Sequence, residues 1–567
     1  MKTAICGSAL ILTDQAVPRL AGPDSKVLLL GEVFPRDGAK TALVSFSATA
    51  ERDAVRSNGA ALSQDYWGAY LAFIARADSK ELSVFRDPSG SMGCFSASVH
   101  GLHCLFSDVE IALELGLAGP RVDWDMLARR IAYPISRDDR TCLDDVTIVL
   151  PGERRCFSGG EASASSLWDP WGFASPEKRI EDDRAAARML AAEIDACVAA
   201  WAAKSPRPLM ELSGGLDSSI IAASLAKCGA GFECVNLYST APGGDERRYA
   251  QAVAARAGAP LRTVVMDGAR ADLRRVAAIR SPNPDGNLLH ELIDEALIGA
   301  CESAGADAFF SGGGGDNIFC HVSTASPAAD RLLSGTGLGA FAQSVRDISA
   351  LNDCSLWIAA RYAVRKAMRA RIAHQPCNDL FLSREALGSP PPLHPWFQGP
   401  PDALPGKREH VASVAFALWN ADTTERSRVA PMRYPLMSQP VAELALRIPA
   451  WMWVRGGRDR AVARAAFGTA LPDIVVNRRT KGDLTGFMTE LYRCQRPLLQ
   501  EILLDGALAK ARIIDRVSVE RRLSSEAFPR QRECGTLLAL AKTDVWAQSW
   551  AGGPRGGGPK GAPLATF

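Results

Sequence analysis

The residues best suited to chemistry lie in the segment 209–224, which reads LMELSGGLDSSIIAAS. Residues 209–212 have the apolar pattern of a buried strand, a glycine turn follows, and residues 218–225 begin an alanine-rich helix. The backbone N–H groups of such a turn and helix start lack intrachain partners and lie at the positive end of the helix dipole. Gly214 and Gly215 let the backbone approach an oxyanion closely, and the serine hydroxyls add donors. The segment therefore predicts a phosphate site.

An acidic residue inside this turn distinguishes it from other phosphate loops. The turn has no lysine before its final serine, so it is not of the Walker type, and it carries Asp217 instead. A carboxylate there would repel a nucleotide unless a cation lay between them, so we infer a Mg²⁺ ion held by Asp217 and phosphate oxygens. An ordinary glycine turn capped by serines is the alternative, but the full run SGGLDSS at a strand–helix junction favours the phosphate site.

A second glycine turn, SGGGGDNIF, follows the strand predicted at residues 306–310. Its Asp316 would lie at a strand end close to Asp217. Two carboxylates suit a Mg²⁺ ion that bridges a triphosphate better than one carboxylate does. Four glycines could merely form a flexible loop, but their position directly after a strand favours a ligand-binding turn.

The order of strands and helices predicts a parallel sheet around both turns. Apolar residues at three- and four-residue steps indicate a helix from about residue 185. Further strands are predicted at residues 232–239 and 261–266, with a helix between them at 243–258. Such alternation implies right-handed crossovers, and it places ligands at the carboxyl ends of the strands.

Two other regions have distinct patterns. The first 160 residues or so are predicted to be β-rich, because short apolar runs at 26–30, 42–46 and 82–85 are separated by turn residues. The proline-rich run at 389–406 predicts an extended loop, which is either a lid over an acceptor or a surface loop without a role.

The composition excludes several classes of function. A chain of 567 residues is too long for one core, and 65 basic against 63 acidic residues argue against a surface that coats nucleic acid. No apolar run approaches the roughly twenty residues of a membrane span, and Asp14 interrupts the short run after Lys2 before a signal peptide could form. Fourteen cysteines without metal-like spacing indicate reduced thiols of a cytoplasmic protein. Residues 551–567 are low in complexity and are predicted to be disordered.

The run SGGxDSS resembles the pyrophosphatase loop of enzymes that cleave ATP between its α and β phosphates. Upstream, YWGAYLAF, FRDPSG and LPGERR in that order resemble the glutaminase domain of the asparagine synthetase family. The resemblance implies an α/β protein with an Ntn-hydrolase-like αββα domain at 1–170 and, at 171–550, a doubly wound parallel-sheet synthetase domain of the PP-loop, adenine-nucleotide α-hydrolase-like type. That family's nucleophilic cysteine follows the initiator Met, where Lys2 stands here, and Cys6 lies within an apolar run. We therefore expect a degenerate glutamine amidotransferase-like domain that makes no ammonia.

Residues 433–452 and 456–487 resemble two further asparagine synthetase segments. The combination of PLMSQP, GGRDR and a lysine–glycine step is similar to lasso peptide cyclases, the macrolactam synthetases of lasso peptide biosynthesis. By position, Lys481 matches the family lysine that stabilises charge at phosphorus and on the tetrahedral intermediate. The sequence departs from asparagine synthetase at Pro431 and Ser438, where that family has Glu and Asp. The change at Pro431 removes a carboxylate that would bind an amino acid, or act as base in β-lactam synthetase.

The resemblance implies an ATP-dependent lasso peptide cyclase. An Asp or Glu side-chain carboxylate of a precursor peptide would be adenylated with release of pyrophosphate, and the N-terminal amine of the same peptide would then displace AMP to form an isopeptide bond. The implied cofactors are ATP and Mg²⁺, and the implied partners are a leader peptidase and a peptide-recognition protein. A β-lactam synthetase or an ammonia-dependent asparagine synthetase acting on a small amino acid, and a non-catalytic peptide-binding scaffold, are the alternatives.

The resemblance also assigns roles to residues. Asp217, Asp316 and Lys481 are the predicted catalytic residues, and the two aspartates are the predicted metal ligands. The predicted nucleotide-binding residues are Leu212, Ser213, Gly214, Gly215, Leu216, Asp217, Ser218, Ser219, Leu237, Ser311, Gly312, Arg458 and Arg460.

Two roles stay open at this point. Arg458, Arg460 or Arg464 would clamp the leaving pyrophosphate, although any of them could be structural. The base that deprotonates the amine is open among Tyr434, Glu443 and His290, which are named only for their proximity to the motifs.

Overall fold

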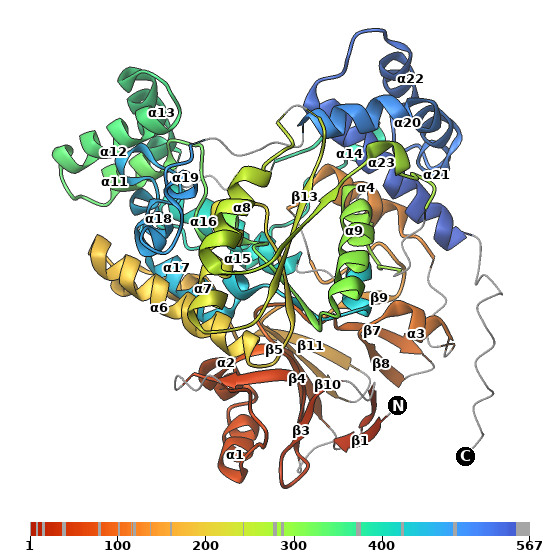
Figure 1. The fold of residues 1–567 in the computed structure, drawn as a ribbon. Coiled ribbons are helices and arrows are strands. Elements are labelled where there is room, and N and C mark those ends of the chain that lie inside the picture. Colours follow the sequence, from red (N-terminus) through yellow and green to blue (C-terminus); the bar gives the residue numbers. More distant parts are fainter. Residues whose placement is uncertain are drawn as a thin grey trace.

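The chain combines antiparallel sheets in its N-terminal part with a parallel sheet at its centre (Figure 1), which confirms the predicted α/β class. Residues 552–567, all but the first residue of the tail predicted to be disordered, lie outside the part of the chain that the structure describes. The computed structural model describes residues 2–6, 9–13, 17–36, 41–76, 81–99, 102–114, 116, 121–135, 138–158, 161–241, 243–275, 280–284, 288–369, 376–420, 424–479 and 485–551.

Helices surround the central sheet and form most of the C-terminal part. The helices up to the second glycine turn are α1 (Ala48–Arg56), α2 (Ala60–Asp65), α3 (Val109–Glu114), α4 (Trp124–Ala132), α5 (Trp171–Ala174), α6 (Asp183–Ala202), α7 (Leu216–Lys227), α8 (Arg247–Ala257), α9 (Leu288–Ala304) and α10 (Gly315–Ile318). The later helices are α11 (Ser326–Leu333), α12 (Leu338–Leu351), α13 (Leu356–Met368), α14 (Arg384–Leu387), α15 (Pro395–Gln398), α16 (Pro405–Trp419), α17 (Gln439–Arg447), α18 (Ala461–Phe467), α19 (Asp473–Val476), α20 (Thr485–Asp505), α21 (Ala507–Lys510), α22 (Arg516–Ser524) and α23 (Gln531–Ala551).

The largest N-terminal sheet has six strands in the order β11–β10–β6–β5–β4–β3, all of them antiparallel. Successive side chains of a strand point to opposite faces, and here Leu28 and Leu30 join one apolar cluster while Val27 and Leu29 join another. The sheet is therefore covered on both faces. A three-stranded sheet, β8–β7–β9, and the hairpin β1–β2 complete this part. The strands are β1 (Lys2–Cys6), β2 (Ala9–Thr13), β3 (Arg19–Ala21), β4 (Val27–Pro35), β5 (Tyr66–Ala75), β6 (Leu82–Arg86), β7 (Phe95–Val99), β8 (Leu102–Phe106), β9 (Val146–Ile148), β10 (Glu153–Ser158) and β11 (Glu161–Ser166).

One strand predicted in this part is wrong. Residues 42–46 are irregular, although their apolar pattern predicts a strand. Phe46 is buried in the core instead, and Ser47 caps α1 by accepting a hydrogen bond from the Ala50 N–H at 3.1 Å. These apolar residues therefore fix the entry into a helix.

The central sheet has the order β14–β13–β12–β15–β16, and each pair of neighbouring strands is parallel, as predicted. The strands β12 and β15 are neighbours, with Glu211 opposite Ser311. The glycine turns that follow these two strands therefore begin side by side. The strands are β12 (Pro208–Glu211), β13 (Glu233–Tyr238), β14 (Leu261–Val265), β15 (Ala308–Ser311) and β16 (Met432–Arg433).

Helices pack on both faces of the parallel sheet (Figure 1). Met210 and Phe310 belong to the large core cluster that also contains residues of α6, α7, α8 and α17. Leu209 and Phe309 alternate with them and pack with Leu297 of α9 in a separate cluster. This arrangement is the doubly wound form that the sequence predicts, and it leaves the carboxyl ends of the strands open to a ligand.

Buried polar contacts join the N-terminal sheet to the central part. The carboxylate of Glu443 on α17 accepts hydrogen bonds from Arg36 at 2.7 and 2.8 Å and from the indole of Trp168 at 2.8 Å. The guanidinium of Arg433 lies 2.5 Å from the carboxylate of Glu32. Because these charges are paired and largely buried, separating the two parts would leave them unsatisfied. The division into domains at residues 170 and 171 stays a prediction.

The proline-rich run at 389–406 is irregular over most of its length, as predicted, but part of it packs into the core. It contains α15, whose Trp396 is 3% exposed. The ring of Trp396 lies 5.1 Å from that of Trp168 and 5.7 Å from that of Trp419. The run is therefore an aromatic anchor between the two parts, which its composition alone could not show.

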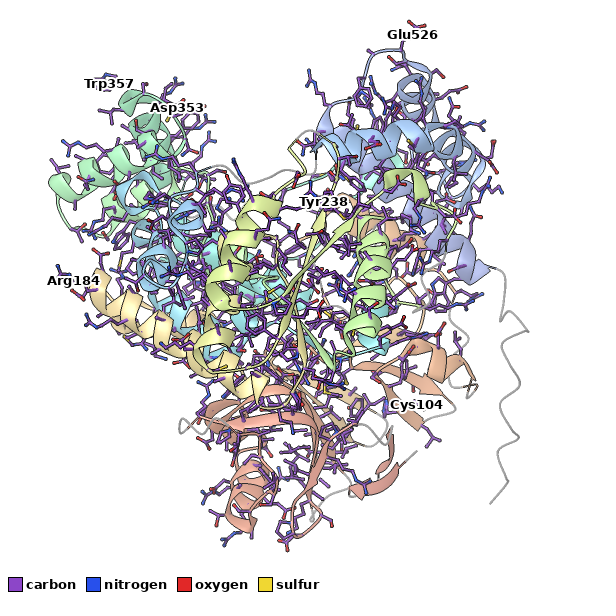
Figure 2. The ribbon with its side chains drawn as sticks, viewed as in Figure 1. Cys104, Arg184, Tyr238, Asp353, Trp357 and Glu526 are labelled. Atoms are coloured by element: carbon purple, nitrogen blue, oxygen red, sulfur yellow. The ribbon has the colours of Figure 1, made fainter. Side chains whose placement is uncertain are left out.

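The helical lobe of α11–α13 exposes apolar side chains. Trp357 lies at the outer end of this lobe (Figure 2) and is 86% exposed, whereas α13 packs inward through Ala359 and Ala363. Within the described part of the chain, no helix is both long enough and apolar enough to cross a membrane.

Candidate active site

The first glycine turn begins where β12 ends and leads directly into α7. Ser213 Oγ accepts a hydrogen bond from the Gly215 N–H at 3.2 Å and lies 3.0 Å from Ser218 Oγ. Gly214 has a φ of 79°, and a Cβ atom there would lie 2.6 Å from Cβ of Tyr249 on α8. A side chain at this position would therefore be strained and would collide, so glycine is required for the turn.

The N-terminus of α7 is open for an anion. Its N-cap residue is Gly215, which offers no side-chain acceptor to the first N–H groups of the helix. Ser219 Oγ donates to the Gly215 carbonyl at 2.6 Å and thereby fixes the turn. Uncapped N–H groups at the positive end of a helix dipole form an oxyanion site.

The second glycine turn packs directly against the first. A Cβ atom at Gly312 would lie 2.6 Å from the Ser218 backbone nitrogen, and one at Gly315 would lie 2.6 Å from Cβ of Asp217. Both glycines are therefore needed for the close approach of the two turns. This contact brings Asp316 to the same place as Asp217.

A cavity of about 560 Å³, here called the first cavity, opens between the two turns. One wall is apolar and is formed by Val235, Leu237, Met266 and Leu297. The opposite wall carries the serine and glycine turns. A cavity with one apolar wall and one wall of N–H and hydroxyl donors suits a planar ring joined to a phosphate chain.

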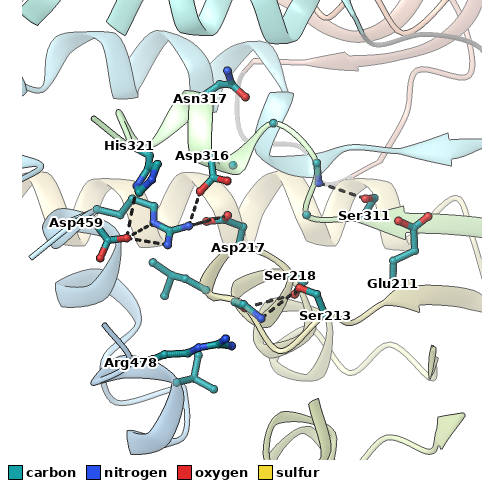
Figure 3. A pocket seen from close by; sticks show the side chains of 18 of the residues that line it. Glu211, Ser213, Asp217, Ser218, Ser311, Asp316, Asn317, His321, Asp459 and Arg478 are labelled. Carbon is teal, nitrogen blue, oxygen red and sulfur yellow. Dashed lines mark hydrogen bonds and ion pairs between the residues drawn. The ribbon is translucent and has the colours of Figure 1, made fainter. Parts of the chain in front are cut away.

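Arg460 bridges the two predicted metal ligands (Figure 3). Its Nη1 atom donates to Asp217 Oδ2 at 2.9 Å and to Asp316 Oδ1 at 2.6 Å. Burial alone would lower the pKa of Arg460, but the carboxylates of Asp217, Asp316 and Asp459 raise it above its ordinary value. The two aspartates therefore share one cation, so the space between them accommodates positive charge.

Asp459 holds Arg460 in this position. Its Oδ2 atom lies 2.7 Å from Arg460 Nη2, and its Oδ1 atom lies 2.9 Å from Arg464 Nη2. His321 Nδ1 is 3.6 Å from Asp459 Oδ2. Burial raises the pKa of Asp459, but the hydrogen bond from His321 and the charges of Arg460 and Arg464 outweigh it and hold that pKa well below its usual value. Asp459 thus stays ionised and fixes the two arginines.

Most of the predicted nucleotide-binding residues line the first cavity. Gly214 and Ser219 do not line the cavity, but they shape the first turn. Arg458 does not line it either, because its guanidinium donates to the Val476 carbonyl at 2.8 Å and to Asn477 Oδ1 at 3.1 Å. Lys481 lies outside the described residues. The predicted residues on the cavity wall are Leu212, Ser213, Gly215, Leu216, Asp217, Ser218, Leu237, Ser311, Gly312, Asp316 and Arg460.

Several residues of the first cavity were missed from the sequence. Asp459 was part of the run GGRDR, but its ion pairs with two arginines could not be read from the motif. His321 and Arg478 also line the cavity, but neither was assigned a role from the sequence, although Arg478 lies within the segment 456–487. Glu211 is the one residue of this group that a local signal could have identified. An acidic side chain in an otherwise apolar strand is unusual unless it has a partner or a function.

A second cavity, of about 910 Å³, adjoins the first. It extends from the carboxyl ends of β12 and β15 to α23 and to the N-terminal part of the chain. The two cavities share six lining residues, so they lie next to each other. The shared residues are Glu211, Ile293, Ser311, Gly313, Gly314 and Asn317.

Charged residues surround the place where the two cavities meet. Arg426 Nη1 lies 3.5 Å from Glu211 Oε1 and 3.4 Å from Asp294 Oδ1. Burial raises the pKa of Glu211, and Arg426 only partly offsets this effect. The pKa of Asp294 is raised in the same way. The carboxylates of Glu211 and Asp294 therefore share the positive charge of one guanidinium, that of Arg426.

The three candidate bases lie in different environments. Tyr434 and His290 line the second cavity. Burial, reinforced by the charge of Arg426, lowers the pKa of His290. Glu443 is held by Arg36, Trp168 and Gln439 between the two parts of the chain, so its carboxylate already has structural partners. The prediction that Glu443 could act as base does not fit this geometry.

One comparison with known proteins, that with family profiles, fits this geometry. The sequence profile described as asparagine synthase matches residues 189–550, which contain the parallel sheet and both glycine turns. No curated protein matches the chain. One solved structure, described as the allosteric regulatory enzyme of purine biosynthesis, is 11% identical over 44% of this chain and 62% of that chain, with a TM-score of 0.18. This chain thus spans less than two thirds of that structure. Since the asparagine synthase profile covers more than half of its length, the chain belongs to the asparagine synthase family, a family of AMP-forming carbon–nitrogen ligases that use ATP and Mg²⁺.

Proposed function

We propose that the protein is a peptide macrolactam synthetase of the lasso peptide cyclase type. It would adenylate an Asp or Glu side-chain carboxylate of a precursor peptide and join that carboxylate to the N-terminal amine of the same peptide. The products would be an isopeptide-bonded ring, AMP and pyrophosphate. The family accounts for the ATP-dependent formation of a carbon–nitrogen bond, and the peptide substrate is our own proposal.

The observation that carries this proposal is the second cavity. Its volume of about 910 Å³ lies near the top of the range of roughly 300–1,000 Å³ that is typical of pockets for drug-sized ligands. Ammonia or a free amino acid would fill only a small part of it. A prefolded stretch of peptide would occupy such a space. The peptide amine would then lie next to a carboxylate activated in the first cavity.

The first cavity fits a nucleotide and its metal. The apolar wall of Val235 and Leu237 suits a base, and the N–H groups of the two turns suit phosphates. Asp217 and Asp316 already share a cation, Arg460, so their oxygens can also hold Mg²⁺ beside phosphate oxygens and water. When bound, Mg²⁺ would neutralise charge on the phosphates.

The chemistry needs two displacements. A carboxylate oxygen of the peptide attacks the α phosphorus of ATP, and the bond to pyrophosphate breaks. The amine then attacks the acyl carbon, and the bond to AMP breaks. The N–H groups of the turns and Arg460 offer fixed donors for the charge that develops at the phosphates. Lys481 is proposed to stabilise the charge at phosphorus and on the tetrahedral oxyanion.

The remaining assignments are proposals of the same kind. The N-terminal part would be an Ntn-hydrolase-like, glutaminase-like scaffold that supplies no ammonia, since Lys2 stands where the family has its nucleophilic cysteine. A leader peptidase and a peptide-recognition protein would deliver the substrate. A reducing, cytoplasmic setting agrees with the described cysteines, which form no disulfide with one another.

The experiment that tests the proposal measures ATP consumption and identifies the products. The purified protein is incubated with Mg²⁺ and ATP and, in separate reactions, with a leader-free lasso core peptide, with aspartate and ammonia, and with a β-amino acid. We expect AMP and pyrophosphate only with the peptide, together with the loss of one water from the peptide mass. AMP formed with a small acid instead would overturn the peptide assignment in favour of asparagine or β-lactam synthesis.

A further inference from the structure

Glu211 lies at the junction of the two cavities. It is the last residue of β12, follows the apolar pair Leu209 and Met210, and lines both the first and the second cavity. In the close-up of the site, Glu211 lies beside Ser311, away from Asp459 and His321 (Figure 3). A carboxylate at this point can therefore contact a group that enters from the second cavity.

The carboxylate of Glu211 is incompletely satisfied by its neighbours. Its Oε1 atom is buried, accepts no hydrogen bond from the described residues, and has the guanidinium of Arg426 at 3.5 Å. The same guanidinium also faces Asp294 at 3.4 Å. The nearby Arg275 does not relieve this imbalance, because its guanidinium is paired with Glu425 at 2.8 Å. The junction thus has more buried negative charge than positive charge, and a cationic ligand would correct this imbalance.

We propose that Glu211 binds the N-terminal ammonium group of the peptide at the junction and accepts its proton for the attack on the acyl adenylate. This inference rests on the proposed function. The peptide backbone would lie in the second cavity, and its activated carboxylate would reach the first cavity across the shared wall.

The proton balance of the step is simple. The ammonium group passes one proton to the Glu211 carboxylate and becomes a neutral amine. The amine forms the new C–N bond, the C–O bond to AMP breaks, and the second proton of the nitrogen is released to solvent. Glu211 then loses its own proton to solvent. Burial brings the proton affinity of Glu211 closer to that of an amine, which assists a general base.

The test separates activation from ring closure in the Glu211→Gln variant. Glutamine keeps the size of the side chain but can neither carry negative charge nor accept the proton. We expect peptide-dependent exchange between ATP and pyrophosphate to stay within about threefold of the wild type, and macrolactam formation to fall by about 100-fold or more. Hydroxylamine is a neutral amine at neutral pH, so it should still trap the activated peptide as a hydroxamate at the wild-type rate.

A matched control is Glu233→Gln. Glu233 belongs to the neighbouring strand β13 but lies at its amino end, paired with Arg262 and outside both cavities. This variant should keep both activities. Normal macrolactam formation by Glu211→Gln would overturn the inference, and so would the loss of its exchange activity, which would assign Glu211 to adenylation or to the fold. If the wild type showed no peptide-dependent exchange at all, the proposed function would fail first and this inference with it.

A second variant tests where the peptide lies, without altering Glu211. Gly535 on α23 lines the second cavity, and a Cβ atom there would meet nothing within 4 Å. The backbone therefore accepts a Cβ atom at this position, and Gly535→Leu should raise the KM for the peptide severalfold while the KM for ATP stays unchanged. An unchanged KM for the peptide would contradict the placement of the peptide in the second cavity.

Discussion

The first and second cavities meet at Glu211 but are lined by different kinds of groups. The first has two glycine turns whose N–H groups and carboxylates come from short, continuous segments, and other parts of the chain complete it with an apolar wall and Arg460. The second is made of side chains from the N-terminal part, from the central sheet and from α23. Backbone donors suit a ligand that never changes, such as a triphosphate, whereas side chains from distant segments can be adapted to one substrate. We therefore propose that the family chemistry resides in the first cavity and the choice of substrate in the second.

The largest effect that separates the two cavities is expected from Asp217→Ala. The variant removes one of the two carboxylates proposed for Mg²⁺, so both the exchange reaction and ring closure should fall by about 100- to 1,000-fold. Arg460 keeps Asp316 and Asp459 as partners, so the melting temperature should change little. Asp53→Ala serves as control, because Asp53 is a half-buried residue of α1 that lines neither cavity. Exchange activity near the wild-type level in Asp217→Ala would remove Asp217 from the site.

Gly312→Ala should have the next largest effect. The added methyl group would lie 2.6 Å from the Ser218 nitrogen, so the two turns must move apart. A displacement of this kind can cost on the order of 100-fold in rate. We expect ATP–pyrophosphate exchange and ring closure to be lost together. Gly339→Ala, at a helical position with open space, is the control and should be neutral or slightly stabilising. Loss of ring closure alone in Gly312→Ala would contradict the division between the cavities.

Arg460→Lys should have a moderate effect. Lysine keeps the positive charge but cannot extend a planar fork to Asp217, Asp316 and Asp459 at once. We expect the exchange rate to fall about tenfold, which corresponds to the loss of one charge-assisted hydrogen bond of about 1.5 kcal/mol. When hydroxylamine competes with the peptide amine, the activated peptide divides between hydroxamate and macrolactam. This ratio should not change in the variant, because Arg460 lines only the first cavity. A change in this partition would mean that Arg460 also acts on the amine.

The smallest effect concerns a buried carboxylate that needs no ligand. Asp87 accepts backbone hydrogen bonds from Ser89 at 2.8 Å and from Tyr70 at 3.1 Å, in contrast to the incompletely satisfied Glu211. Burial raises the pKa of Asp87 from 3.8 to about 6. Between these pH values the unfolded chain releases the proton and the folded chain keeps it, so the free energy of unfolding should fall by up to about 3 kcal/mol as the pH rises.

Asp87→Asn should remove this dependence without changing the partition of the peptide between hydroxamate and macrolactam. Urea denaturation of the variant and the wild type at several pH values between 4 and 6.5 measures it. Equal pH slopes in the two proteins would show that Asp87 is ionised in the folded state.

The same difference in construction decides what the sequence could predict. The turns at Ser213 and Ser311, the parallel sheet and the pairing of Asp217 with Asp316 follow from short motifs after strands, and the structure brings them together. The bridge from Arg460 to Asp217 and Asp316, the anchor formed by Trp396 and the second cavity depend on contacts between distant segments. No local pattern records such contacts, so these features appeared only in the folded chain. The strand predicted at residues 42–46 is wrong for a related reason. A short apolar run is equally compatible with a strand and with a segment that anchors a helix.

The central claim is that a carboxylate activated in the first cavity is joined to an amine held in the second. The most direct measurement uses a core peptide whose reactive side-chain carboxylate carries a heavy-oxygen label on both oxygens. After one turnover, we predict that one labelled oxygen is found in AMP and that the other is retained in the macrolactam. Label in phosphate or pyrophosphate, or a macrolactam formed without label in AMP, would contradict the account.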